Sequence, residues 1–122
     1  MLLSPLDWVA SPTTVFVPDL MVVRRDQVDL DDPFTGTPLL VVEVLSPITV
    51  ATDRTLKRQQ YEQHGVGAYW MVDPGRPDGA PSLVALRLGD GAYAEEMVVE
   101  GDDAFTTDFP FPVTVVPDHL IR

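Results

Sequence analysis

Three residues that lie far apart in the sequence could together carry hydrolytic chemistry: Asp19, Glu43 and Lys57. Glu43 stands inside the apolar run from Leu39 to Leu45, where an unpaired carboxylate would be costly to bury. Asp19 follows Pro18 inside another apolar stretch, and Lys57 is the only lysine of the chain. Two carboxylates and a nearby lysine supply oxygen ligands for Mg²⁺ and a cation to stabilise charge or orient water. A Mg²⁺ site for phosphodiester hydrolysis needs such a set.

Each of the two acids also has a structural interpretation. Glu43 could form an ion pair with Lys57 or Arg58 that satisfies a buried carboxylate without any catalysis. Asp19 could belong to an ordinary Pro-Asp turn. Both alternatives stay open from the residues alone.

The spacing of polar residues around Lys57 predicts which face of a helix it occupies. Asp53, Lys57 and Tyr61 recur every four residues and so share one face of a helix, with Gln60 and His64 beside them. Taken alone, such a stripe is most simply a solvated face. A helix that crosses back over a sheet, however, would let Lys57 reach the end of the strand that carries Glu43, which favours a site.

The elements that must position these residues follow from the central stretch. The continuous apolar run 39–45 is typical of a strand covered on both faces. Thr49 or Thr52 is a candidate cap for a helix that runs to about His64, with Gly65 as its stop signal. Residues 67–72 form the next strand. A strand, a helix and a strand predict two parallel strands with a right-handed crossover, and hence an α/β fold.

The flanking segments predict further strands. Residues 6–10 and 14–23 have strand composition, and Pro18 suggests an edge or a bulge in the second. An acidic, exposed loop then joins strands that we expect to pair antiparallel. Near the carboxyl end, apolar runs on both sides of Gly89-Asp90-Gly91 predict a hairpin. Residues 109–121 predict a short strand, with Asp118 capping a terminal turn.

Composition bounds the class of protein. The 122 residues fit one domain, 1–122, and contain no cysteine, which favours the cytoplasm. We see no signal peptide and no apolar run long enough to span a membrane. The net charge of −11 argues against a broadly basic nucleic-acid surface, but residues 46–76 carry four basic side chains against three acidic ones.

The remaining aromatic and histidine residues predict structure rather than chemistry. Tyr61, Tyr69 and Trp70 are expected in the core, because base-stacking platforms would need a basic exposed surface around them. His64 lies next to the helix stop and His119 is isolated, so neither predicts a zinc site.

The combined motifs resemble those of the Uma-two (Uma2) family, restriction-endonuclease-like proteins of the PD-(D/E)xK superfamily. The resemblance covers most of the chain from residue 15 onward. It rests on Val17-Pro18-Asp19, Val42-Glu43-Val44-Leu45-Ser46-Pro47, Asp53, Lys57, Tyr61 and Gly67-Ala68-Tyr69-Trp70-Met71-Val72-Asp73-Pro74.

This resemblance implies a restriction-endonuclease-like core and a DNA endonuclease that depends on Mg²⁺, with Mn²⁺ as a substitute. It implies Asp19 and Glu43 as metal ligands, the Val44 carbonyl as a candidate third ligand and Lys57 as the catalytic lysine. In the superfamily the lysine usually lies two residues beyond the acid, where this chain has Leu45. The Uma2 family is thought to supply it from the following helix.

One departure from the family leads to an alternative function. Members usually begin with a helix, further strands and another acidic residue, whereas seventeen residues precede Pro18 here. We therefore expect an exposed or dimer-paired sheet edge, and a homodimer that buries the apolar segment 1–10, with Leu2, Leu3, Leu6, Trp8 and Val9. The alternative is a catalytically impaired, nuclease-like dimeric binding or regulatory subunit.

Overall fold

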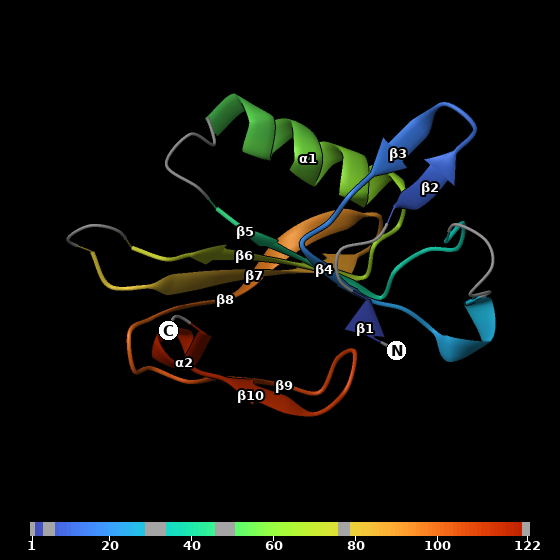
Figure 1. The fold of residues 1–122 in the computed structure, drawn as a ribbon. Helices are drawn as coiled ribbons and strands as arrows, with labels where there is room; N and C mark the ends of the chain where they lie inside the picture. The colour runs from blue at the N-terminus through green and yellow to red at the C-terminus, as the bar shows by residue number, and fades with distance from the viewer. Residues whose placement is uncertain (1, 4–6, 29–33, 46–50, 76–78, 121–122) are drawn as a thin grey trace.

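A mixed six-stranded sheet forms the centre of the chain (Figure 1). The computed structural model describes residues 2–3, 7–28, 34–45, 51–75 and 79–120. Strands β5 and β6 are parallel, and the other neighbouring strands of the sheet are antiparallel. In spatial order the strands are β1 (Leu2–Leu3), β4 (Leu20–Val22), β5 (Leu40–Val44), β6 (Ala68–Asp73), β7 (Ser82–Gly89) and β8 (Ala92–Glu100). The predicted α/β class is confirmed.

Different elements cover the two faces of the sheet (Figure 1). Helix α1 (Ala51–Gln63) joins β5 to β6 and lies on one face beside the hairpin of β2 (Trp8–Ser11) and β3 (Thr14–Phe16). The other face carries β9 (Phe105–Thr107), β10 (Val113–Val115) and the short helix α2 (Pro117–Leu120). A 3-10 helix, η1 (Arg25–Gln27), lies in the loop between β4 and β5. No helix in the described ranges is long and apolar enough to cross a membrane.

The predicted strand, helix and strand are present. Helix α1 ends at Gln63, and Gly65 follows with a φ of +79°, as expected for a stop signal. The candidate cap Thr49 lies outside the described residues, and so does the side chain of Thr52. The parallel register sets Val41 beside Tyr69 and Glu43 beside Met71.

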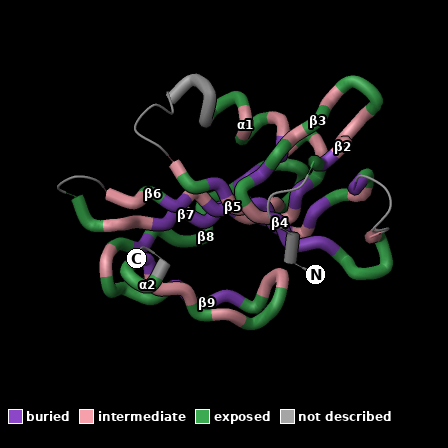
Figure 2. Tube along the Cα trace, in the orientation of Figure 1, coloured by how far each residue is buried: buried purple, intermediate pink, exposed green. Residues whose placement is uncertain are grey.

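The buried residues form two clusters, one on each face of the sheet. Buried stretches run along the central strands of the sheet (Figure 2). Side chains of a strand alternate between faces. In β5, Val41 therefore joins the cluster under α1 with Tyr61 and Tyr69, while Leu40 joins the cluster over β9 with Trp70. Glu43 has the parity of Val41 and points toward α1. The prediction of a strand covered on both faces, and of core aromatics, is confirmed.

The long amino-terminal strand predicted over 14–23 is divided at Pro18-Asp19. Strand β3 pairs with β2, and β4 enters the central sheet as the neighbour of β5. Trp8 is 1% exposed and its ring stacks 6.1 Å from that of Tyr61. Trp8 is therefore covered within its own chain, and the homodimer expected to bury segment 1–10 is not needed to bury this side chain. The side chains of Leu2, Leu3 and Leu6 lie outside the described residues.

The carboxyl-terminal segments largely match the predictions. Strands β7 and β8 form the expected hairpin, and Asp90 and Gly91 at its turn have φ values of 53° and 80°. Two consecutive positive φ angles are what a two-residue type I′ turn requires. Strand β10 pairs with β9 in a small sheet of its own. Asp118 lies in the first turn of α2, after Pro117, rather than before the helix as a cap.

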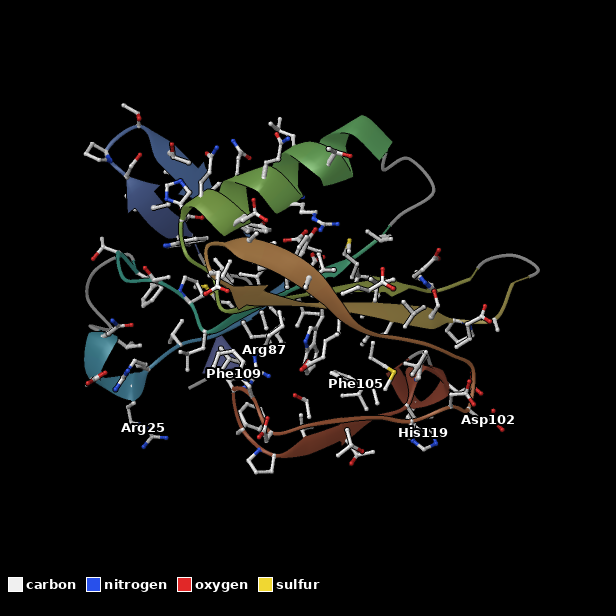
Figure 3. The ribbon with its side chains drawn as sticks, turned by 180° about the vertical axis from the view of Figure 1, so that it is seen from behind. Arg25, Arg87, Asp102, Phe105, Phe109 and His119 are labelled. Carbon is white, nitrogen blue, oxygen red and sulfur yellow. The ribbon has the colours of Figure 1, made fainter. Side chains whose placement is uncertain are left out.

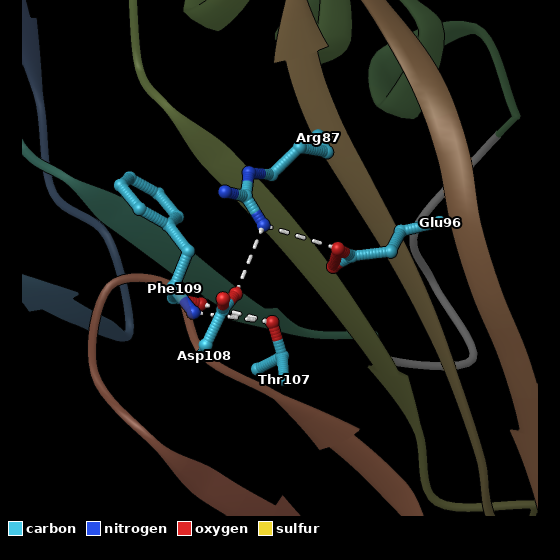
Figure 4. Close-up of polar contacts among 5 residues, drawn as sticks. All are labelled: Arg87, Glu96, Thr107, Asp108 and Phe109. Carbon is cyan, nitrogen blue, oxygen red and sulfur yellow. Dashed lines mark hydrogen bonds and ion pairs between the residues drawn. The ribbon is translucent and has the colours of Figure 1, made fainter.

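A polar cluster around Arg87 holds the segment after β9 against the sheet (Figures 3 and 4). Nη1 of Arg87 is 3.1 Å from Oε2 of Glu96 and 3.9 Å from Oδ1 of Asp108. The guanidinium carbon lies 4.3 Å from the centre of the Phe109 ring. This ring packs on Gly67, where an added Cβ would come within 2.7 Å of it. The cluster joins β7, β8 and the chain that follows β9.

Candidate active site

Asp19 is fixed by the backbone of β5. Its Oδ2 accepts a hydrogen bond of 2.7 Å from the N–H of Val44. The register pairs Leu20 with Val42, so two residues further along Pro18 would stand opposite Val44. Proline has no N–H and cannot continue the ladder. The carboxylate of Asp19 therefore accepts the hydrogen bond that the backbone of β4 would otherwise accept from Val44. The Pro-Asp pair thus directs an acidic side chain to the end of β5.

The Val44 carbonyl faces the same side as Asp19. The N–H of the next residue, Leu45, donates to Val72 of β6. Neighbouring residues of a strand point their backbone groups in opposite directions, while the N–H and C=O of one residue point the same way. Val44 therefore directs both groups toward β4, where Pro18 has no N–H to give its carbonyl. This arrangement fits the expected role of that carbonyl as a ligand.

Glu43 is buried and receives a hydrogen bond on each oxygen. Nζ of Lys57 lies 3.2 Å from Oε2, and the Tyr61 hydroxyl donates to Oε1 at 3.1 Å. Both donors come from α1, one turn apart, as their spacing of four residues requires. The sequence placed Lys57 near Glu43 but placed Tyr61 only in the core. The shared helical face was the signal that could have assigned Tyr61 to the site.

Burial dominates the electrostatics of Glu43. It raises the pKa of this carboxyl, and the negative charge of Asp19 adds to the rise, while Lys57 and Tyr61 oppose it. The net direction is upward. Burial and the neighbouring Glu43 likewise raise the pKa of Tyr61, so its phenol keeps its proton and remains a donor. The site thus holds a carboxylate whose charge is only partly compensated.

A cleft of about 230 Å³ brings the predicted site residues together. Its walls contain both acids, the lysine and the strand residue whose carbonyl was expected to bind metal. It is lined by Val17, Asp19, Glu43, Val44, Leu45, Lys57 and Tyr69. Leu45, at the usual position of the superfamily's lysine, contributes an apolar wall, and Lys57 enters from α1 instead.

Two other residues of the helical stripe do not extend the site. The side chain of Asp53 lies outside the described residues. The His64 ring lies 5.9 Å from the rings of Trp8 and Phe16, in edge-on contact, which places it in an aromatic cluster. Within the described ranges, no group of three or more His, Cys, Asp or Glu side chains could hold a metal ion. A metal at the cleft would therefore rest on two carboxylates.

Two carboxylates and a carbonyl suit Mg²⁺. This ion prefers oxygen ligands, keeps several waters, and is commonly bound through one or two carboxylates together with substrate phosphates. Each carboxylate oxygen of Glu43 has a second lone pair beyond the one used by its donor. The residues present therefore fit a hard divalent cation in the cleft.

Comparisons with known proteins identify the family of the chain. The family model named Uma2, described as "Putative restriction endonuclease", matches residues 3–115. The chain belongs to the Uma2 family. The resemblance inferred from its motifs is therefore confirmed. No curated protein matches the chain.

A solved structure supports the fold of this Uma2 chain. It is similar to the crystal structure of a putative nuclease belonging to DUF820 from Anabaena variabilis ATCC 29413, with a TM-score of 0.72 and 20% sequence identity. The match covers 98% of this chain and 66% of that one, so this chain spans just under two thirds of its length. The fold is that of a putative nuclease, of the restriction-endonuclease-like type.

Proposed function

We propose that this Uma2 chain is an endonuclease that hydrolyses phosphodiester bonds of DNA with Mg²⁺, for which Mn²⁺ can substitute. One observation carries the proposal: Asp19, Glu43 and Lys57 come from a strand end, a strand and a helix, and all line the same cleft. The family and the fold support a nuclease. We add to this the metal, the DNA substrate and the role of each residue.

Asp19, Glu43 and the Val44 carbonyl would hold the metal. When bound, the ion would lower the pKa of a water molecule and offset negative charge on the scissile phosphate. Tyr61 keeps Glu43 oriented through its hydrogen bond to Oε1. Asp19 is oriented by the Val44 N–H, so both acids are held by groups of the folded chain before any ligand arrives.

Lys57 would act on the substrate. Its side chain is 37% exposed and its ammonium lies in the cleft beside Glu43. From there it can stabilise the negative charge that grows on the phosphate during attack, or orient the attacking water. A long, flexible ammonium suits this role because it can follow the charge as it develops.

Two observations favour the second candidate, a binding or regulatory subunit that acts as a dimer. Both oxygens of Glu43 already receive donors from α1, so the carboxylate is satisfied without a metal. Such a contact can be purely structural. The net charge of −11 also weakens attraction to a phosphate backbone.

Plasmid cleavage separates the two candidates. Wild-type protein should nick supercoiled plasmid with Mg²⁺ or Mn²⁺ and be inactive in EDTA. Lys57→Ala should lower the rate by on the order of 10²–10³-fold, as expected for loss of a group that stabilises transition-state charge. Arg58→Ala is the matched control, because Arg58 is the next cation on α1 and its guanidinium donates to the Tyr93 carbonyl instead. Equal cleavage by wild type and Lys57→Ala would reject the role of Lys57, and no cleavage by wild type with either metal would reject the endonuclease.

A further inference from the structure

The two donors on Glu43 differ in their freedom to move. Tyr61 is 1% exposed and packs against Trp8, Phe16 and Tyr69, so its hydroxyl is held in place. The side chain of Lys57 is 37% exposed and ends in a rotatable ammonium. One oxygen of Glu43 thus has a fixed partner, and the other has a partner that can leave.

Lys57 is also the cation that balances the acids of the cleft. Among the described residues that line it, Asp19 and Glu43 carry negative charge and Lys57 carries the positive one. Arg58, the nearest cation along α1, is directed to the backbone of Tyr93 on β8. Removal of the Lys57 charge would leave Glu43 without the cation that pairs with it in the described part of the cleft.

We propose that Lys57 is an exchangeable counterion: it neutralises Glu43 while the cleft holds no divalent cation, and turns to a substrate phosphate once a cation is bound. Tyr61 keeps Oε1 in position during this exchange. The inference rests on the proposed function, because it uses the same carboxylates as ligands. It adds that Lys57 opposes metal binding while serving the reaction.

This exchange predicts opposite effects of one substitution on two measurements. A positive charge beside Oε2 repels an incoming divalent cation. Lys57→Met removes that charge and should tighten metal binding by on the order of tenfold, about 1.4 kcal/mol, while cleavage is lost. A lysine that only oriented Glu43 would give the reverse, because its loss would weaken metal binding.

The test is a titration of the protein with Mn²⁺, without DNA, followed by the electron paramagnetic resonance signal of the free ion. Lys57→Met should bind Mn²⁺ more tightly than wild type, and Lys57→Arg, which keeps the charge, should bind as wild type does. Arg58→Gln removes a charge outside the cleft and should also leave the affinity unchanged. Lys57→Gln keeps a hydrogen-bond donor but removes the charge. It should also bind Mn²⁺ more tightly than wild type, and it replaces the Met variant if that variant does not fold.

The outcomes are distinct. Equal or weaker Mn²⁺ binding by both neutral variants, in protein whose circular dichroism matches wild type, overturns the exchange and leaves the endonuclease intact. Tightening in Arg58→Gln as large as in Lys57→Met also overturns it, since the effect would then be one of net charge. Absence of any Mn²⁺ binding by wild type removes both the exchange and the metal-dependent function.

Discussion

Two carboxylates of similar geometry lie on opposite faces of the sheet. Glu43 is paired with Lys57 at 3.2 Å on the α1 face, and Glu96 is paired with Arg87 at 3.1 Å on the other. Their surroundings differ. The side chain of Glu43 is 10% exposed and shares a cleft with a second acid, while that of Glu96 is 29% exposed. Pair distance therefore does not separate the two carboxylates, whereas burial beside a second acid does.

The two cations of these pairs, Arg87 and Lys57, also differ in their surroundings. Arg87 is held by Glu96, by Asp108 and by the face of the Phe109 ring, so its charge is shared among groups that tie the segment after β9 to the sheet (Figure 4). Among the described residues, Lys57 has one acid partner, and its side chain lines a cleft. The Arg87 cluster therefore stabilises the packing of the segment after β9 on the sheet. The Lys57–Glu43 pair remains accessible to a ligand from the cleft.

The largest expected effect on stability comes from a substitution at Gly67, on which the Phe109 ring of the Arg87 cluster packs. A Cβ at this position would lie 2.7 Å from the Phe109 ring and 3.0 Å from the Leu39 carbonyl. Gly67→Ala should lower the free energy of unfolding by about 1–3 kcal/mol, as overpacking does. Urea unfolding followed by fluorescence measures the loss.

A double variant tests the cause. Phe109→Ala removes the ring that the new methyl group meets, so in its presence Gly67→Ala should cost less than it does alone. An undiminished cost in the Phe109→Ala background would assign the effect to the Leu39 backbone and not to the docked ring.

The sequence predicted most of the central fold because its signals are local. The apolar run of β5, the glycine after α1 and the turn at Asp90-Gly91 each determine one element through hydrophobic pattern or backbone conformation. The docking of the segment after β9 was not predictable. It depends on Arg87 meeting Phe109 and Asp108 across more than twenty residues, and no local pattern reports such a contact.

The site was predictable in its members more than in its geometry. A charged residue inside a continuous apolar run pointed to Glu43, and the rarity of lysine pointed to Lys57. The hydrogen bond from Tyr61 to Glu43 was missed because a buried tyrosine on a helix most often packs in the core. The link between Asp19 and Val44 depends on the strand register, which the sequence of β4 alone does not determine.

The next largest expected effect is the rise in stability on binding of Mg²⁺ to the cleft. With a dissociation constant of about 1 mM, about 10 mM Mg²⁺ adds roughly 1.4 kcal/mol to the stability of the wild-type protein. For a chain of this size that is a rise in melting temperature of about 3–8 °C. Differential scanning fluorimetry at constant ionic strength measures it, and Ca²⁺ should act similarly.

The two faces give a matched pair of variants for this shift. Glu43→Gln should abolish most of it, while Glu96→Gln should keep it, although each replaces one paired glutamate by its neutral isostere. Loss of the shift in both variants, or in neither, would show that the effect of Mg²⁺ is not localised at the cleft.

The smallest expected effect is the dependence of stability on pH, and its sign follows from the raised pKa of Glu43. A carboxyl whose pKa is higher in the folded than in the unfolded chain stabilises the fold fully below its ordinary value of 4.5, and loses that contribution as the pH rises through the folded value. Glutamine does not titrate, so the stability of Glu43→Gln does not fall in this way as the pH rises. Without metal, the stability of the variant relative to wild type should therefore increase with pH from about 4.5 upward.

Urea unfolding across this range of pH, in EDTA, checks the sign. Glu96→Gln serves as the control, because it subtracts the general effect of removing one negative charge from a chain with a net charge of −11. If Glu43 were only a structural partner of Lys57, its charged form would be the favoured one and Glu43→Gln would become less stable relative to wild type as the pH rises. The slope after subtraction of the control therefore shows whether the buried acid opposes the fold at neutral pH, as a metal ligand without its metal should.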